Sequence, residues 1–196
     1  MISQLSLIFT SKSKAQEIVL LLHDAKEVVR QGFYEKELPA VKEFCAKNNL
    51  FLVRSKFKVI LDDENNFTNK GLRIPEKDPH LGMYFIYFSK DETKAYLASY
   101  YELIENHQKL GLLLGYPECC VDFFYQNFNE NKTDLQLKPT NLYTNITKRN
   151  EDLVVISHFP CNSDCEKSIE LGKRYLELLY KIDPARAQEL HTMLSC

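Results

Sequence analysis

The chain has 196 residues, 44% of them hydrophobic and 27% charged, an ordinary composition for a soluble globular protein that is long enough to bury a core. Its formal net charge of −2 excludes a strong global field that would draw it to nucleic acid or to a membrane surface. No apolar run approaches the roughly 20 residues of a membrane span, and residues 1–5 lack the features of a signal peptide. We therefore expect a cytoplasmic protein with no membrane partner, whose cysteines meet a reducing environment.

The first half of the chain predicts two helices followed by two strands. Apolar residues recur at three- and four-residue spacing over 14–31 and again over 36–47, which indicates two amphipathic helices. Alternating apolar residues over 50–61 predict a strand, and the aromatic run 83–88 predicts a second strand that can pair with it antiparallel. The polar segment 62–79 between these strands predicts a loop.

The second half is expected to contain more helix. A helix is predicted over 91–109, followed by a tight buried connection over 110–114. The apolar stripe of that helix, which we expect to face the core, consists of Tyr96, Leu97, Tyr100, Leu103 and Ile104. The polar stretch 129–147 predicts a surface loop or lid, and 152–159 predicts a strand. An Asp-Pro pair predicts the start of a last helix over 184–194.

These elements predict an α+β fold in which the whole chain forms a single domain. A small antiparallel sheet from 50–61 and 82–88, with 152–158 as a candidate third strand, would pack against several helices, because helical stripes and aromatic strands each need a partner surface. Within that domain, residues 1–109 are an N-terminal part composed of helices and strands, and residues 110–196 are the part that carries the cysteine motifs.

Four of the six cysteines lie in two short clusters, each at the expected start of a helix. The first cluster is Gly-Tyr-Pro-Glu-Cys-Cys at 115–120, and its helix is expected to reach about Phe128. The second is His-Phe-Pro-Cys-Asn-Ser-Asp-Cys at 158–165, and a helix that starts inside it is expected to reach about Lys181. The N–H groups of a helix N-terminus favour thiolate over thiol. The two clusters therefore indicate a joint site for a metal, an iron–sulfur cluster or thiol chemistry.

Helix geometry sets how these cysteines can share one site. Cys161 and Cys165 are four residues apart, which puts both sulfurs on one helix face, or one at the cap and the other a turn later. Adjacent Cys119 and Cys120 point roughly 100° apart on a helix, so we expect one of them to face the second cluster. The other is a fourth ligand, a catalytic thiol or a core residue. Three thiolates would leave a metal position open for chemistry, whereas four would close the site around zinc or an iron–sulfur cluster.

His158 and Glu118 complete the candidates for a catalytic role beside Cys119 and Cys120. His158 is a ligand, a general base or a donor to a cluster sulfur, or else a histidine hydrogen-bonded at a strand end. Glu118 can act as an acid or base, although a glutamate in the first turn is favourable with the helix dipole alone. Cys45, on the apolar face of its helix, is expected to be a core residue.

The two cysteine motifs together resemble one family. Leu-Gly-Tyr-Pro-Glu-Cys-Cys-Val-Asp-Phe-Phe at 114–124, followed by Ser-His-Phe-Pro-Cys-Asn-Ser-Asp-Cys-Glu at 157–166, is similar to a mostly archaeal family known as domain of unknown function 483. The resemblance covers about residues 110–180. It implies no activity, but it implies that five residues belong to one site: Cys119, Cys120, His158, Cys161 and Cys165.

We interpret the chain as a cysteine-ligated metal or iron–sulfur protein whose cofactor is an iron–sulfur cluster or zinc. An enzyme that acts through the metal or a thiol is favoured, on a small-molecule or RNA substrate that the sequence leaves unspecified. One alternative is a thiol–disulfide redox protein, and another is a non-enzymatic RNA- or protein-binding module with structural zinc. Basic residues beside Tyr143 in the segment 129–150 can contact RNA, but the net charge disfavours a nucleic-acid partner.

Overall fold

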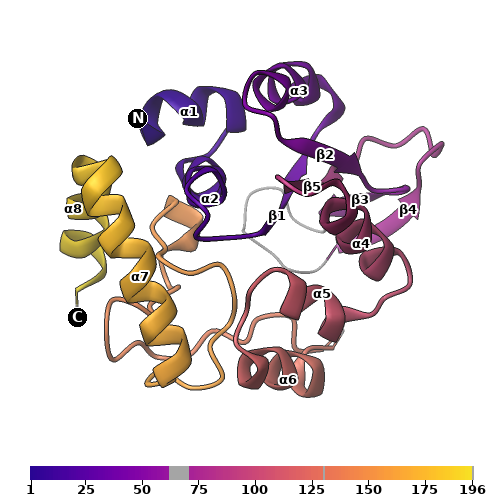
Figure 1. The fold of residues 1–196 in the computed structure, drawn as a ribbon. Coiled ribbons are helices and arrows are strands. Elements are labelled where there is room, and N and C mark those ends of the chain that lie inside the picture. The colour runs from indigo at the N-terminus through magenta and orange to yellow at the C-terminus, as the bar shows by residue number, and fades with distance from the viewer. Residues whose placement is uncertain (62–70, 130, 196) are drawn as a thin grey trace.

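The computed structural model describes residues 1–61, 71–129 and 131–195 (Figure 1). The strands are β1 (Val28–Phe33), β2 (Phe51–Arg54), β3 (Phe57–Leu61), β4 (Gly71–Pro75) and β5 (Tyr84–Ser89). The α-helices are α1 (Ile2–Phe9), α2 (Lys12–Leu22), α3 (Leu38–Lys47), α4 (Glu92–Leu103), α5 (His107–Leu113), α6 (Glu118–Asn127), α7 (Glu166–Ile182) and α8 (Pro184–Leu194). Small antiparallel sheets packed with helices confirm the predicted α+β class.

The central sheet has three strands with β5 in the middle. β1 and β2 pair with the two sides of β5, both antiparallel, which confirms the expected pairing of the aromatic strand with the start of 50–61. The run 50–61 is nevertheless two strands, because β3 leaves this sheet and pairs with β4 in a hairpin. The break falls at Ser55, whose buried Oγ donates to the Phe57 carbonyl and accepts the Phe85 N–H. β4 lies within the segment predicted to be a loop, of which 62–70 fall outside the described residues.

Alternate residues of the sheet face two different helical layers. Val29 and Phe88 belong to the main core, which α1, α2 and α3 share with α7, α8 and the segment 146–156. Their neighbours Val28 and Tyr87 belong to a smaller cluster with residues of α4 and α5 on the other face. The main core thus contains residues from both the N-terminal and the cysteine-bearing parts of the chain, and α7 and α8 lie beside α1 and α2 in Figure 1.

The predicted helix over 14–31 is wrong in its second half. α2 ends at Leu22, the backbone turns through a left-handed residue at Asp24 with φ 60°, and Val28 begins β1. The adjacent β-branched pair Val28–Val29 satisfies helical spacing by coincidence, and its stiff side chains suit the pleated strand better. The pattern also failed to indicate α1, of which Ile2 and Phe9 are buried in the core.

The predicted helix over 91–109 is two helices, and its apolar stripe faces outward. α4 ends at Leu103, the backbone turns through the left-handed residue Glu105, and Asn106 caps α5. The expected connection 110–114 is therefore helical as far as Leu113. The residues of α4 that face inward are Ala95, Ala98 and Glu102. The two alanines allow a close approach to the sheet, and Glu102 accepts hydrogen bonds from Arg30 and Tyr87. The five stripe residues are therefore exposed on the opposite side.

The predicted strand over 152–159 is irregular in the structure. Val154, Val155 and Ile156 are buried as expected, but their segment joins neither sheet. A side chain of α2 hydrogen-bonds it instead: Gln16 donates its Nε2 to the Val154 carbonyl at 3.0 Å. With its backbone held in this way, the segment packs against α2, and β1 takes the place expected for the third strand.

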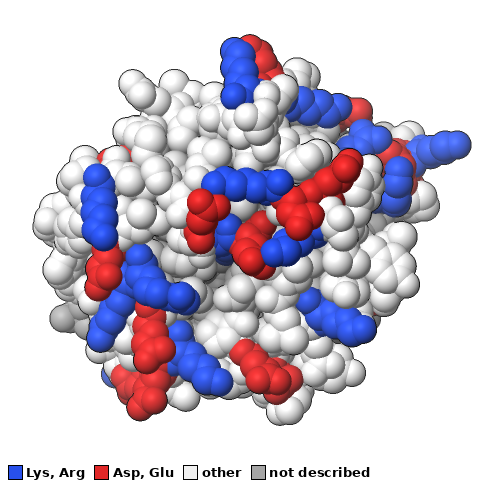
Figure 2. All heavy atoms as spheres, in the orientation of Figure 1, with Lys and Arg blue, Asp and Glu red and all other residues white. Residues whose placement is uncertain are grey.

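The surface carries charges of both signs. On the face drawn in Figure 2, Lys and Arg side chains are interleaved with Asp and Glu side chains, in keeping with the net charge of −2. Within the described part of the chain, no helix has the length and hydrophobicity needed to cross a membrane.

Candidate metal centre

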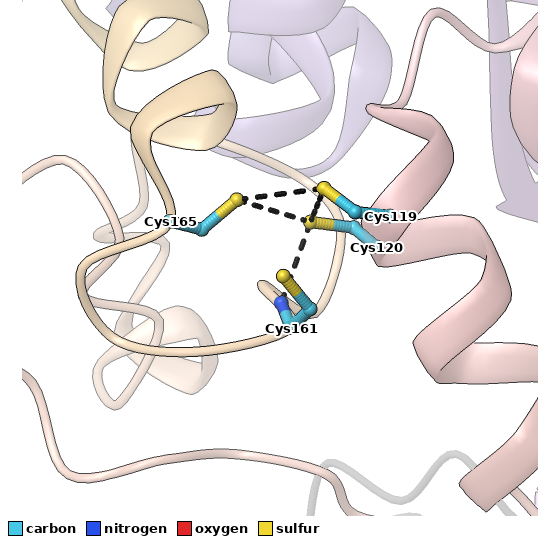
Figure 3. A group of neighbouring side chains, drawn as sticks. All are labelled: Cys119, Cys120, Cys161 and Cys165. Atoms are coloured by element: carbon cyan, nitrogen blue, oxygen red, sulfur yellow. Dashed lines mark hydrogen bonds between the residues drawn. The ribbon is translucent and has the colours of Figure 1, made fainter.

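Four cysteine sulfurs from two distant parts of the chain meet at one point (Figure 3). Cys165 Sγ lies 3.7 Å from both Cys119 Sγ and Cys120 Sγ, and the last two are 3.9 Å apart. With Cys161 included, all four sulfurs lie within 4.8 Å of one another. Cys120 and Cys165 are buried, while the other two are half-buried. The structure therefore brings together all four clustered cysteines.

The first pair sits in the opening turn of α6. Gly115, with φ +79°, makes the turn after α5, and Pro117 is the residue that precedes the helix. One of Cys119 and Cys120 faces the second cluster as expected, and of the three alternatives left open for the other, the geometry favours a fourth ligand, because both sulfurs lie 3.7 Å from Cys165 Sγ. The roughly 100° divergence of neighbouring residues separates side chains around the helix axis. It does not keep apart two sulfurs that converge near the helix end, where each rotates about its own Cα–Cβ bond.

The second pair sits in a loop that ends at a helix cap. α7 begins at Glu166 with Cys165 as its N-cap, so the expected helix start at 161–162 and a shared helix face for the second pair are both wrong. The reason is that the Ser163 carbonyl accepts hydrogen bonds from side chains outside the helix. Asn141 Nδ2 donates to it at 2.9 Å and Thr144 Oγ1 at 2.6 Å. Cys165 N–H closes a tight turn onto Asn162 instead.

The polar segment predicted to be a surface loop or lid holds this cysteine loop in place. Thr140 Oγ1 donates to Asp164 Oδ1 at 2.7 Å, and Ser163 Oγ donates to the Lys138 carbonyl at 2.5 Å. Together with the two bonds to the Ser163 carbonyl, these contacts run along 138–144. The Asn and Thr side chains of the segment therefore hold the cysteine loop by hydrogen bonds.

Hydrogen-bond donors already point at two of the sulfurs. The Cys161 backbone N–H donates to Cys120 Sγ at 3.3 Å, and Ser168 Oγ lies 3.2 Å from the same sulfur. Asn162 Nδ2 donates to Cys161 Sγ at 3.7 Å. Donors of this kind favour the thiolate, which is the form that binds metals.

The pKa values of these thiols diverge because burial and hydrogen bonding oppose one another. Burial raises the pKa of Cys120, and it raises the pKa of Cys161 to about 11. Burial also acts upward on Cys165, but hydrogen bonds from the Ser168 side chain and backbone outweigh it and lower the pKa to about 7. Four adjacent thiolates repel one another, so a cation at their centre is what would allow all of them to ionise together.

His158 reaches the sulfurs through a serine. Its side chain is buried at 7% exposure, and its Nε2 lies 2.8 Å from Ser168 Oγ, which in turn contacts Cys120 Sγ. Its Nδ1 has no hydrogen-bond partner within the described residues. Burial, and secondly the charge of Lys26, lower the pKa of His158 to about 3, so the imidazole is neutral. When Cys120 is a thiolate, Ser168 donates to the sulfur and His158 donates Nε2–H to Ser168.

The other candidate residues lie outside the sulfur cluster. Glu118 is exposed at the first position of α6, where its charge complements the helix dipole. Cys45 is 2% exposed in the main core, where burial raises the pKa of its thiol to about 12. Sequence reasoning missed Ser168. Its signal was available, because it follows Cys165 by three residues and so shares its side of the helix.

The fold and the sulfur cluster define a small α+β protein with a candidate metal centre built from two helix starts. The model of one family matches residues 94–194, which are more than half of the chain and include all four clustered cysteines and His158. The chain belongs to that family, described as Protein of unknown function (DUF483), which confirms the resemblance noted in the sequence. A comparison with curated proteins found no match, and neither did a comparison with solved structures.

Proposed function

We propose that the protein binds one metal ion of the zinc class through Cys119, Cys120, Cys161 and Cys165. The sulfur spacing carries this proposal. A tetrahedral ion with Zn–S bonds of about 2.3 Å places its sulfurs about 3.8 Å apart. Three of the sulfur pairs are separated by 3.7, 3.7 and 3.9 Å, which is close to the edge of that tetrahedron.

The same spacing favours a single ion over an iron–sulfur cluster. In a cluster the four cysteine sulfurs are divided among two or more irons, so some of them lie farther apart than the ligands of one ion. Here every sulfur lies within 4.8 Å of each of the others. A cluster would require the loop at Cys161 and the N-terminus of α7 to move outward.

Four thiolates close the coordination sphere, and closed sites are typical of structural zinc. The ion would tie the start of α6 to the loop and cap before α7, segments that the chain separates by about 40 residues. We therefore propose a structural role for the metal in a binding protein, in place of an open position that performs chemistry.

A thiol–disulfide protein is the second candidate, because the same four sulfurs can approach one another in pairs. Their separations of 3.7–3.9 Å exceed the roughly 2.05 Å of a disulfide bond. In that case the protein would carry reversible disulfides and no stoichiometric metal.

Anaerobic purification followed by metal and acid-labile sulfide analysis tests the proposal. We expect one equivalent of zinc per chain, no sulfide, and four cysteines that alkylate only after a chelator removes the ion. Iron with stoichiometric sulfide would show that the four cysteines hold an iron–sulfur cluster and would contradict the single-ion proposal. No metal together with two disulfides that dithiothreitol reverses would establish the redox alternative.

Ser168→Ala is expected to weaken metal binding without abolishing it. The change removes the hydroxyl that contacts Cys120 Sγ and leaves buried His158 Nε2 without its partner. Loss of such an outer contact typically lowers metal affinity about 10–100-fold, and an unpaired buried polar group costs about 1–3 kcal/mol. Competition against a chromophoric chelator measures the first effect, and chemical denaturation measures the second.

Ser195→Ala is the matched control, since the Ser195 side chain is exposed and its hydroxyl donates, among the described residues, only to the carbonyl of His191. It should leave zinc affinity unchanged. Equal affinities for the Ser168 and Ser195 variants would show that the serine does not support the metal.

A further inference from the structure

A cavity of about 340 Å³ adjoins the sulfur cluster. Its walls come from the central sheet, the β3–β4 hairpin, α5, α6 and the loop that precedes the second cysteine pair, and Cys120 is part of its lining. Its volume falls within the roughly 300–1,000 Å³ of small-molecule sites. Neither the family description nor the proposed metal site assigns a ligand to it.

Two guanidinium groups in this cavity converge on a single buried carboxylate. Arg30 donates Nη2 to Glu102 Oε1 at 2.8 Å, and its Nε bonds the other carboxylate oxygen. Arg73 Nη2 lies 3.8 Å from Glu102 Oε1 and donates to the Glu102 carbonyl at 3.1 Å. The Glu102 side chain is only 5% exposed and also accepts the Tyr87 hydroxyl. The single buried carboxylate of Glu102 is therefore shared by the positive charges of two guanidinium groups.

A second carboxylate, that of Glu105, lies near the two arginines but is too exposed to neutralise their remaining positive charge. Arg73 Nη1 reaches Glu105 at 3.2 Å, but the Glu105 side chain is 68% exposed, so water screens much of the interaction. In the described part of the chain, Arg30 Nη1 and Arg73 Nε make no hydrogen bond. The described lining thus has a surplus of positive charge and donors that remain available.

Aromatic rings form another part of the lining. Phe124 and Phe128 stack with ring centroids 4.6 Å apart and planes 22° apart, and Phe159 lies within 14° of the plane of Phe124. All three rings line the cavity and are half-buried. On the sheet side, the Arg30 guanidinium lies 3.6 Å from the centroid of the Phe85 ring. Near-parallel rings of this kind offer stacking surfaces to a flat ligand.

We propose that this cavity binds a small planar aromatic anion, whose ring packs on the phenylalanine wall and whose carboxylate or phosphate group binds Arg30 and Arg73. Charge-assisted bonds from guanidinium groups to such oxygens are among the stronger polar contacts in proteins. This proposal does not rest on the metal site, because among the described residues neither arginine has a hydrogen bond to a cysteine.

Calorimetric titration of the purified protein with 2-naphthoate, 2-naphthyl phosphate and the uncharged 2-naphthamide tests the inference. We expect the better of the two anions to bind at least about tenfold more tightly than the amide, as hydrogen bonds to a charged group imply. The difference between the carboxylate and the phosphate identifies which anionic group the site prefers. Equal affinity for the amide and both anions, or no heat from any probe at millimolar concentration, would overturn the proposal.

Two variants separate the charge from the aromatic wall. Arg73→Gln should remove most of the preference for the anion and leave amide binding unchanged, while Phe128→Leu should weaken all three probes. Arg174→Gln, which removes an exposed arginine from α7, is the matched control and should change nothing. Unaltered anion preference in a folded Arg73→Gln protein would overturn the assignment. If that variant does not fold, the wild-type preference must fall as sodium chloride rises, and a salt-independent preference would overturn it equally.

Discussion

Chelation of the metal ion is expected to lower the free energy of unfolding by about 4 kcal/mol or more. An ion that binds only the folded protein stabilises it by about 4.1 kcal/mol when its free concentration is 1,000 times its dissociation constant. The ion would also neutralise mutual repulsion among four thiolates held within 4.8 Å. Denaturant unfolding in dithiothreitol, with micromolar zinc or with a strong chelator, measures the difference.

Each of the four single Cys→Ser variants is expected to lose at least about a hundredfold in zinc affinity, beyond the range known for outer contacts. Because both members of the adjacent pair reach Cys165, the Cys119 and Cys120 variants should lose similar amounts. Cys45→Ala is the control, a buried cysteine in the main core that should keep full metal content. Full metal content in a Cys161 or Cys165 variant would contradict the four-thiolate centre.

The residues of the candidate site could be predicted because the residue types and their spacing in the sequence indicate thiol or metal chemistry. Two pairs of cysteines, each beside a proline and ahead of an amphipathic run, are unusual enough to indicate a joint site. Their geometry could not be predicted. The start of α7 depends on Asn141 and Thr144, which hydrogen-bond the Ser163 carbonyl from a segment some 20 residues away. No local pattern in 158–166 contains that contact.

The fold class followed from element types, whereas the element boundaries depended on tertiary contacts. α3, α6 and α8 were predicted well, since capping or proline signals mark their ends. The prediction of which face of α4 is buried was wrong, because hydrophobic spacing takes no account of ion pairs. Its Glu102 is drawn inward by Arg30 and Tyr87, which turns the large apolar side chains outward. The partners of Glu102 lie 15 and 72 residues away, beyond any helical period.

Lys26→Met is expected to cost about 3–5 kcal/mol of stability, the range for leaving one member of a buried ion pair alone. The Lys26 side chain is 1% exposed, and its Nζ lies 2.7 Å from Glu17 Oε1, whose own side chain is 9% exposed. It also donates to Ser157 Oγ at 3.2 Å and approaches the Tyr116 ring at 5.4 Å. Lys26 therefore joins the end of α2 to the loop that carries His158.

The charge of Lys26 is present at neutral pH. Burial alone would lower its pKa, but Glu17 outweighs that effect and raises the pKa above the ordinary value of 10.5. A raised pKa means that the stabilisation is complete below that ordinary value and is lost only as the pH rises through the higher folded-state pKa. Chemical denaturation of the wild type between pH 6 and 9 should therefore show no decrease in the free energy of unfolding that is caused by titration of Lys26.

The exposed pair Lys47–Glu43 supplies the matched control for Lys26→Met. Its Nζ–Oε1 distance of 2.6 Å is as short as that of the buried pair, but its side chains are 70% and 68% exposed. Lys47→Met should change stability little, because water already solvates both charges. Adding Glu17→Gln to Lys26→Met should recover part of the lost stability, since it removes the stranded buried charge while an amide oxygen still faces Gln31. A Lys26→Met protein as stable as the Lys47→Met protein would show that the buried pair does not hold α2 against the His158 loop.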